Sequence, residues 1–226
     1  YLRILRFFRF WAWYGDPHQG IDPEGLAACA QLQSGLDVIS KERIGSEFLK
    51  LLAAPNPAPA LAAMEATGIL AYILPGASAR DMALLEEAEQ GLEPDALRRL
   101  ALLGGDALQE NLRLGNAAAR QVEQLRHHGQ NSDMALAHGF ALGAERGWSS
   151  WLLRSVWLEQ IPSAEDRLAV SAGAIEVCPV RAVDLKGLFE GLALGAALRQ
   201  VETAWLASHM QLKKPELIAR LRAERE

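Results

Sequence analysis

Three arginines return at every third position near the start of the chain: Arg3, Arg6 and Arg9 lie within the apolar run YLRILRFFRFWAWYG. On a helix these positions fall within one sweep of about 120°, so the three guanidinium groups share one face. A helix that is apolar over the rest of its surface is expected to be buried, where an unpaired guanidinium costs several kcal/mol. The stripe therefore predicts either an ion-paired core helix or a groove that binds nucleotide or phosphate.

A second group of charged residues lies in the stretch SKERIGSEFLKLL, which begins at Ser40. Ser40 is expected to cap a helix, and Glu42 lies in its first turn, where a negative charge suits the helix dipole. We expect Glu42 or Glu47 to ion-pair one arginine of the opening helix and to brace it. The alternative is a solvated network of Glu47 with Arg43 and Lys50, worth a few tenths of a kcal/mol per pair.

Helix start and stop signals recur along the chain, and most segments follow the 3.6-residue period. The expected starts are Asp22 before Pro23, Asn56 before Pro57, Ser78 with Asp81, and Ser163 with Asp166. The expected ends are Gly68, Gly91 and Gly129. The one candidate strand, from Ile69 to Leu74, is too short to build a sheet. These patterns predict an all-α fold, an irregular bundle of roughly ten helices.

The two charged stretches together resemble a known family. YLRILRFFRF resembles the last part of the neck motif, Glu-Asp-x-x-Arg-x-x-Arg, of class II tRNA nucleotidyltransferases and the related bacterial poly(A) polymerases. SKERIGSEFLKLL resembles the Ser-x-Glu-Arg-Ile-x-x-Glu-Leu-x-Lys motif that follows it, in the same order and at a matching spacing. ILAYILPG is similar to the leucine–proline turn that closes this region, and GLFEGLALGAALRQVETAWLAS resembles the closing helices of bacterial members.

The resemblance implies a role for each arginine. In that family an aspartate and the first arginine of the neck motif read the Watson–Crick edges of incoming CTP and ATP, and Arg3 matches that arginine. A guanidinium fork donates paired hydrogen bonds to a base edge in a geometry that lysine does not match. Arg6 matches the second arginine and is expected to face phosphate or to have a structural role. The expected supporting residues are Arg9, Ser40, Glu42, Arg43 and Glu47.

The resemblance also implies an organisation and a set of partners. Residues 1–75 are expected to form a neck-like helical domain, and residues 76–226 a body and tail that bind tRNA. In the family, carboxylates of an N-terminal catalytic head hold Mg²⁺, and the present sequence has neither a strand-borne Asp-x-Asp nor a glycine–serine phosphate loop. We therefore expect a part of a nucleotidyltransferase that holds no metal and is inactive alone. Its expected partners are tRNA, CTP and ATP, and its own catalytic domain, because the Glu-Asp of the motif would lie just before Tyr1.

Composition excludes some classes of protein. The net charge of −5 argues against a surface that coats nucleic acid generally, although it allows a local basic groove. Cys29 and Cys178 stand far apart and form no metal or redox pattern. No apolar stretch approaches the ~20 residues of a membrane span. We expect a soluble cytoplasmic protein that has no membrane contact.

Two other interpretations of the whole chain stay open. The first is the same part of a poly(A) polymerase, since the determinants that separate CCA, A-only and poly(A) addition are expected in the head. The second is a non-catalytic helical module that binds another protein and keeps its arginine stripe ion-paired inside. The negative net charge favours this second interpretation, and binding of tRNA at low salt would argue against it.

Two smaller clusters also have alternative interpretations. His127 and His128 lie near an expected helix end, where they favour a C-terminal cap over metal ligation. Trp148, Trp151 and Trp157 lie close together in the sequence and predict core packing or, alternatively, a platform that stacks RNA bases.

Overall fold

The computed structural model describes residues 1–16 and 19–223, and helices are its regular elements throughout these ranges. Two bridges, Ala77 with Gly104 and Lys186 with Phe189, are isolated and extend into no sheet in the described part. The expected all-α fold is confirmed. The described residues form fifteen α-helices rather than roughly ten, because several helices are as short as four or five residues.

The helices follow one another with short connections. The first group is α1 (Arg3–Tyr14), α2 (Pro23–Gln31), the 3₁₀ helix η1 (Gln33–Val38), α3 (Lys41–Leu52), α4 (Ala58–Ala66) and α5 (Ile69–Ile73). The second group is α6 (Met82–Ala88), α7 (Ala96–Leu103), α8 (Leu108–Leu112), α9 (Asn116–Asn131), α10 (Ala135–Leu142), α11 (Ala144–Trp157) and α12 (Ala164–Gly173). The last group is α13 (Ala182–Leu185), α14 (Gly191–Ala207) and α15 (Lys214–Ala223).

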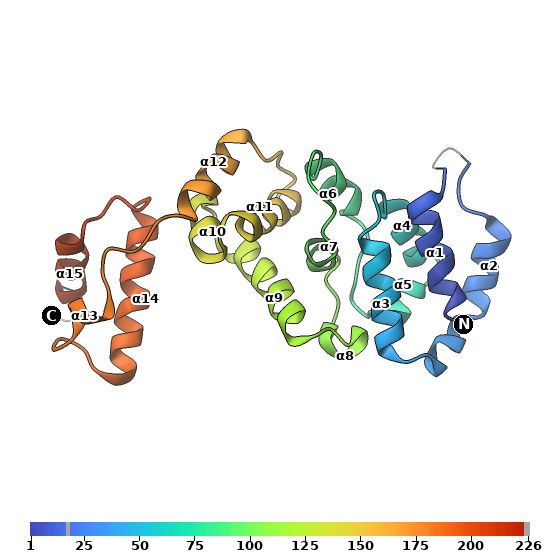
Figure 1. The fold of residues 1–226 in the computed structure, drawn as a ribbon, viewed down its shortest axis with the longest axis horizontal. Coiled ribbons are helices and arrows are strands. Elements are labelled where there is room, and N and C mark those ends of the chain that lie inside the picture. Colours follow the sequence, from blue (N-terminus) through green and yellow to red (C-terminus); the bar gives the residue numbers. More distant parts are fainter. Residues whose placement is uncertain (17–18, 224–226) are drawn as a thin grey trace.

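The three groups form an elongated molecule (Figure 1). Helices α1 to α5 lie at one end, α6 to α12 occupy the middle, and α13 to α15 form a separate lobe at the other end. The two termini therefore lie at opposite ends of the molecule. Within the described residues, none of the helices is both long and apolar enough to cross a membrane.

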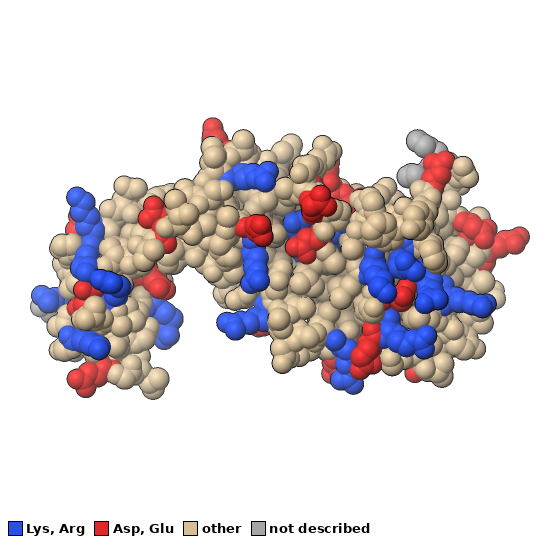
Figure 2. Space-filling view, in the orientation of Figure 1, with Lys and Arg blue, Asp and Glu red and all other residues tan. Residues whose placement is uncertain are grey.

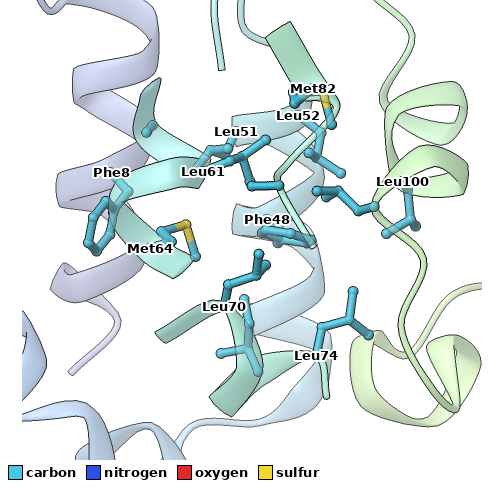
Figure 3. Close-up of a cluster of buried hydrophobic side chains, with 14 of the residues drawn as sticks. Phe8, Phe48, Leu51, Leu52, Leu61, Met64, Leu70, Leu74, Met82 and Leu100 are labelled. Carbon is cyan, nitrogen blue, oxygen red and sulfur yellow. The ribbon is translucent and has the colours of Figure 1, made fainter. Parts of the chain in front are cut away.

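One hydrophobic cluster joins the first two groups of helices. It runs from Leu2 to Val156, and its largest buried side chains include Phe8 and Phe48 (Figure 3). A second, smaller cluster lies between Cys178 and Leu221 in the terminal lobe. The main core crosses position 75 without interruption, and the expected division into residues 1–75 and 76–226 remains a prediction.

Several expected helix boundaries are confirmed. Asp22 caps α2 by accepting hydrogen bonds from the backbone N–H groups of Glu24 and Gly25, and Pro23 follows at the first helical position. Ser163 and Asp166 form a reciprocal capping box at the start of α12. These caps use side chains close in sequence, which is why local pattern predicted them.

Other expected boundaries are wrong, and tertiary contacts explain two of them. The helix expected after Asn56 begins at Ala58, whose N–H donates to the carboxylate of Glu86 at 2.7 Å. Gly129 lies inside α9 rather than at its end, because a Cβ at this position would lie 2.8 Å from the ring of Trp157. The helix expected from Ser78 begins at Met82.

Candidate nucleotide-binding face

Helix α1 buries one face and exposes the other. Ile4, Leu5, Phe8 and Ala12 recur at helical spacing and pack into the main core. The opposite face carries exposed side chains, including Arg3. The expectation that α1 is a fully buried helix is wrong, since its apolar residues are divided between core and solvent.

Arg3, Arg6 and Arg9 differ sharply along the exposed face. Arg9 is half-buried, and its Nε donates a hydrogen bond to Oε2 of Glu47 at 2.8 Å. Arg6 is exposed, and its Nε lies 3.9 Å from the same carboxylate oxygen. Arg3 is exposed and makes no ion pair or side-chain hydrogen bond with any residue that the structure describes. The guanidinium groups therefore have fewer ion-pair and hydrogen-bond partners toward the start of the helix.

Helix α3 supplies the carboxylate that holds this face. Glu47 is only 6% exposed and also lies 3.5 Å from Nζ of Lys50. The predicted ion pair between α3 and the opening helix is thus present and is made by Glu47. Of the alternative network of Glu47 with Arg43 and Lys50, the pair with Lys50 is present, but the carboxylate of Glu47 is buried rather than solvated.

The other supporting residues of α3 lie at its exposed start. Ser40 occupies the N-cap position with extended backbone angles, but its hydroxyl accepts no backbone hydrogen bond within the described part of the helix start. Glu42 lies 3.6 Å from Nε of Arg113 rather than near α1. Hydrogen bonding to its own backbone N–H lowers the pKa of Glu42, as do the Ser40 hydroxyl and the Arg113 charge. Arg43 is exposed.

Positive charge gathers over α1 and α3. Figure 2 shows Lys and Arg side chains surrounding a small acidic patch on this end of the molecule. The exposed cations include Arg3, Arg6, Arg43 and Lys50. Because Glu47 is buried beneath them, the surface here attracts anions although the whole chain carries a net charge of −5.

A buried pair of arginines on α7 was not predicted from the sequence. Arg98 and Arg99 are 5% and 2% exposed, and both contact the carboxylate of Glu89. Arg99 also donates from Nη1 to the carbonyl oxygens of Leu52 and Ala54, at 2.7 and 2.6 Å. These bonds satisfy the C-terminal end of α3 and tie it to the middle of the molecule. The signal was two arginines inside the apolar helix ALRRLALL.

The histidines and tryptophans singled out in the sequence lie on α9 and α11. Trp148 and Trp157 pack against the main core, as core packing requires. Trp151 lies edge-on to the ring of His138 at 5.2 Å. His128 lies in the last turn of α9, but burial and the neighbouring His127 lower its pKa, which disfavours the cationic form that would suit the helix dipole.

The donor set of the described residues does not fit a metal ion. Across residues 1–16 and 19–223, no three His, Cys, Asp or Glu side chains come together as ligands. Cys29 and Cys178 are buried free thiols, and burial raises the pKa of both. The face of α1 and α3 instead presents exposed guanidinium and ammonium groups, which are donors suited to anions.

Comparisons with known proteins agree with this architecture. A family model described as the probable RNA and SrmB-binding site of polymerase A matches residues 20–80. The human mitochondrial CCA tRNA nucleotidyltransferase 1 is 27% identical over 240 residues, which cover 97% of this chain and 54% of that protein. The chain therefore spans about half the length of this curated relative.

Solved structures share the fold. The Thermotoga maritima CCA-adding enzyme complexed with tRNA superposes with a TM-score of 0.55 at 15% identity, covering 100% of this chain and 61% of that one. A CCA-adding enzyme complexed with ATP gives a TM-score of 0.59 at 15% identity, covering 100% and 60%. At this identity the likeness concerns the fold.

The helical fold of this chain is the kind seen in the helical part of CCA-adding enzymes. The chain is thus similar to a curated CCA tRNA nucleotidyltransferase and, over residues 20–80, to an RNA-binding family model of polymerase A, and it shares the helical fold of solved CCA-adding enzymes.

Proposed function

We propose that this chain is the C-terminal helical part of a tRNA nucleotidyltransferase that adds CCA to tRNA 3′ ends. Its α1 face would select CTP and ATP, and its helical body and tail would hold tRNA. The observation that carries the proposal is the contrast within α1: Arg9 is held by Glu47, while Arg3 is exposed and unpaired among the described residues. The N–H donors of an exposed guanidinium remain accessible to a ligand, whereas those of Arg9 are engaged by Glu47.

The geometry supports a division of roles. Glu47 fixes Arg9 and so fixes α1 against α3, which orients the helix end that carries Arg3. Arg3 then presents paired N–H donors to the acceptor edge of an incoming base. Arg6, which Glu47 holds only loosely at 3.9 Å, is placed to neutralise a phosphate.

Catalysis belongs outside the described residues in this proposal. Mg²⁺, bound by the carboxylates of a catalytic domain, would activate the 3′ hydroxyl and stabilise the leaving pyrophosphate. The residues of this chain would position the base and the RNA. We expect the chain alone to be inactive and to need its own N-terminal catalytic domain.

A second candidate is the same role in a poly(A) polymerase. It is favoured by the description of the family model that matches residues 20–80, which names polymerase A. Products of the parent enzyme, sequenced after incubation with CTP and ATP, would separate CCA from A-only addition.

The cytoplasmic location expected from the sequence stays a prediction, since the human relative is named as mitochondrial.

The test of the proposal replaces Arg3 in the parent enzyme. Arg3→Ala and Arg3→Lys are expected to lower incorporation of CTP and ATP or to scramble their order by about tenfold or more, because lysine lacks the paired donor geometry. Arg80→Ala is the matched control, since Arg80 is exposed and lies on the connection before α6. Unchanged rate and fidelity in both Arg3 variants would overturn the role of Arg3.

A binding measurement separates the proposal from a protein-interaction module. Fluorescence anisotropy of this chain with labelled tRNA is expected to show binding at low salt that weakens as salt rises, because phosphate contacts release counterions. Failure to bind tRNA even at low salt would favour a protein partner instead.

A further inference from the structure

The face of α1 carries an aromatic cluster in addition to its arginines. Phe10, Trp13 and Tyr14 are 51%, 41% and 77% exposed, although each is a large ring on a well-packed helix. Large exposed apolar side chains that gather in one place usually mark a binding surface. The aromatic cluster therefore needs an explanation that base reading by Arg3 does not supply.

Contacts hold the rings of this cluster in defined positions. The rings of Phe10 and Tyr14 lie 6.1 Å apart, with an angle of 29° between their planes. The guanidinium carbon of Arg9 lies 4.5 Å from the centre of the Phe10 ring, and Arg9 is itself fixed by Glu47. The indole N–H of Trp13 donates to the carbonyl oxygen of Lys50 at 2.9 Å. The cluster is thus ordered before any ligand arrives.

The charge around the cluster restricts what can bind it. Arg6 and Lys50 are exposed beside the rings, and the carboxylate of Glu47 is buried beneath them. An aliphatic protein surface would desolvate these cations and offer them no acceptor beyond Glu47, whereas a ligand with flat rings and a negative backbone satisfies both features. Single-stranded nucleic acid has this chemistry, and proteins bind it by combining basic grooves with aromatic stacking.

Other exposed apolar residues lack this combination. Ile161 and Leu192 are almost fully exposed, but both are aliphatic and therefore have no ring that could make a cation–π contact. They offer no flat ring on which a base could stack. The aromatic cluster of α1 therefore differs from ordinary exposed hydrophobic residues.

We propose that Tyr14, backed by Phe10, stacks an unpaired base of an RNA strand, while Arg6 and Lys50 neutralise the adjacent phosphates. The proposal rests on the proposed function, because it assumes that RNA reaches this face. It adds a second contact to the face: Arg3 would read the incoming nucleotide, and the aromatic cluster would hold the strand that receives it.

The experiment measures binding of this chain to a short labelled single-stranded RNA by fluorescence anisotropy. Tyr14→Leu is expected to weaken binding about tenfold, because stacking contributes about 1–3 kcal/mol per base. Tyr14→Phe keeps the ring and is expected to bind as the unchanged chain does. Leu192→Ala is the control for loss of exposed apolar surface elsewhere, and thermal unfolding checks that each variant is folded.

A second probe separates stacking from charge. An oligonucleotide with the same phosphates but without bases is expected to bind the unchanged chain about tenfold more weakly, and to be insensitive to Tyr14→Leu. Equal loss of affinity for both probes, or no loss with Tyr14→Leu, overturns the stacking proposal. Salt-dependent tRNA binding in that case leaves the proposed function standing.

The opposite failure is also distinguishable. If Tyr14→Leu weakens RNA binding but Arg3→Ala leaves CTP and ATP selection unchanged in the parent enzyme, the stacking proposal holds and base reading by Arg3 fails. If neither tRNA nor the single-stranded RNA binds at low salt, both proposals fail, and the aromatic cluster belongs to a protein interface.

Discussion

Two arginine clusters in this molecule are built on the same plan and differ in one respect. Each is organised around one buried carboxylate, Glu47 for the arginines of α1 and Glu89 for Arg98 and Arg99 of α7. In the α7 cluster the guanidinium groups are buried and hydrogen-bonded. In the α1 cluster only Arg9 is held closely, and the groups become exposed toward the start of the helix.

The difference separates arginines that support the fold from arginines that are free to bind a ligand. Arg99 directs its Nε and Nη2 to Glu89 and its Nη1 to the carbonyl oxygens of Leu52 and Ala54, and its side chain is buried, so the guanidinium is not available to a ligand and the pair serves the fold. None of the N–H donors of the Arg3 guanidinium is bound to another described residue. Donor satisfaction is thus a better guide to function here than the presence of arginine itself.

The largest effect is expected at the buried cluster. Glu89→Ala removes the carboxylate that pairs directly with two buried guanidinium groups, and we expect it to lower the free energy of unfolding by about 3–5 kcal/mol. Urea denaturation followed by circular dichroism measures this loss. Glu87→Ala, an exposed change in the last turn of α6, two residues before Glu89, is the control and should stay within about 0.5 kcal/mol. Equal effects of the two variants would contradict the distinction between buried and exposed clusters.

His138 is a buried titratable side chain that, unlike the arginines of the two clusters, has no carboxylate partner among the described residues. His138 is fully buried, its Nε2 lies 3.2 Å from the carbonyl oxygen of Ser132, and its Nδ1 has no partner within the described residues. Burial lowers the pKa of His138 from 6.5 to about 4, and the charges of His128 and Arg154 act in the same direction. The unfolded chain therefore binds this proton first as the pH falls.

Acid is accordingly expected to destabilise the fold through His138. The contribution is complete above about pH 6.5 and is lost as the pH falls through about 4, for a total of about 3 kcal/mol and about 2 kcal/mol between pH 7 and 5. Urea titrations at both pH values test this, and His138→Gln should remove most of the pH dependence. A parallel decline in both proteins would assign the acid effect to other groups, such as His128, whose pKa burial also lowers.

A smaller effect is expected at the half-exposed cluster. Glu47→Gln keeps an acceptor for Arg9 but removes the charge, and should lower the free energy of unfolding by about 1–2 kcal/mol. Glu42→Gln is the matched control on the same helix, and because its carboxylate is exposed the change should cost no more than about 0.5 kcal/mol. If Glu47→Gln also leaves denaturation unchanged, Glu47 does not fix α1 against α3.

The smallest effect on stability is expected at Arg3. Arg3→Ala should change the free energy of unfolding by less than about 0.5 kcal/mol, because the side chain is exposed and unpaired in the described structure. Arg9→Ala on the same helix should cost about 1–2 kcal/mol, since it strips Glu47 of its closest partner. A loss above about 1 kcal/mol for Arg3→Ala would mean that Arg3 serves the fold rather than a ligand.

Prediction from the sequence succeeded where the interacting residues are close in the chain. The cap at Asp22 and the capping box of Ser163 with Asp166 are local, and sequence pattern located both. It also found that α3 would supply an acidic partner for α1, although it could not choose between Glu42 and Glu47. That choice depends on which face of α3 turns toward α1.

Prediction failed where distant elements determine the environment. Arg99 lies 45 positions or more from the carbonyl groups of Leu52 and Ala54 that it caps, so its burial was invisible in the local sequence. Gly129 looked like a helix end, but the approach of Trp157 requires a glycine inside α9.

The amino-acid sequence by itself determined the all-helical architecture and the arginine spacing of α1, because both follow from periodicity and from side chains that act over a few residues. Only the tertiary structure decided which arginines are free. The main core takes Ile4, Leu5, Phe8 and Ala12 and leaves the opposite face of α1 in solvent. Burial of Glu47 and Glu89 between helices then sets which guanidinium donors are satisfied, and a burial of this kind depends on the packing of the whole fold.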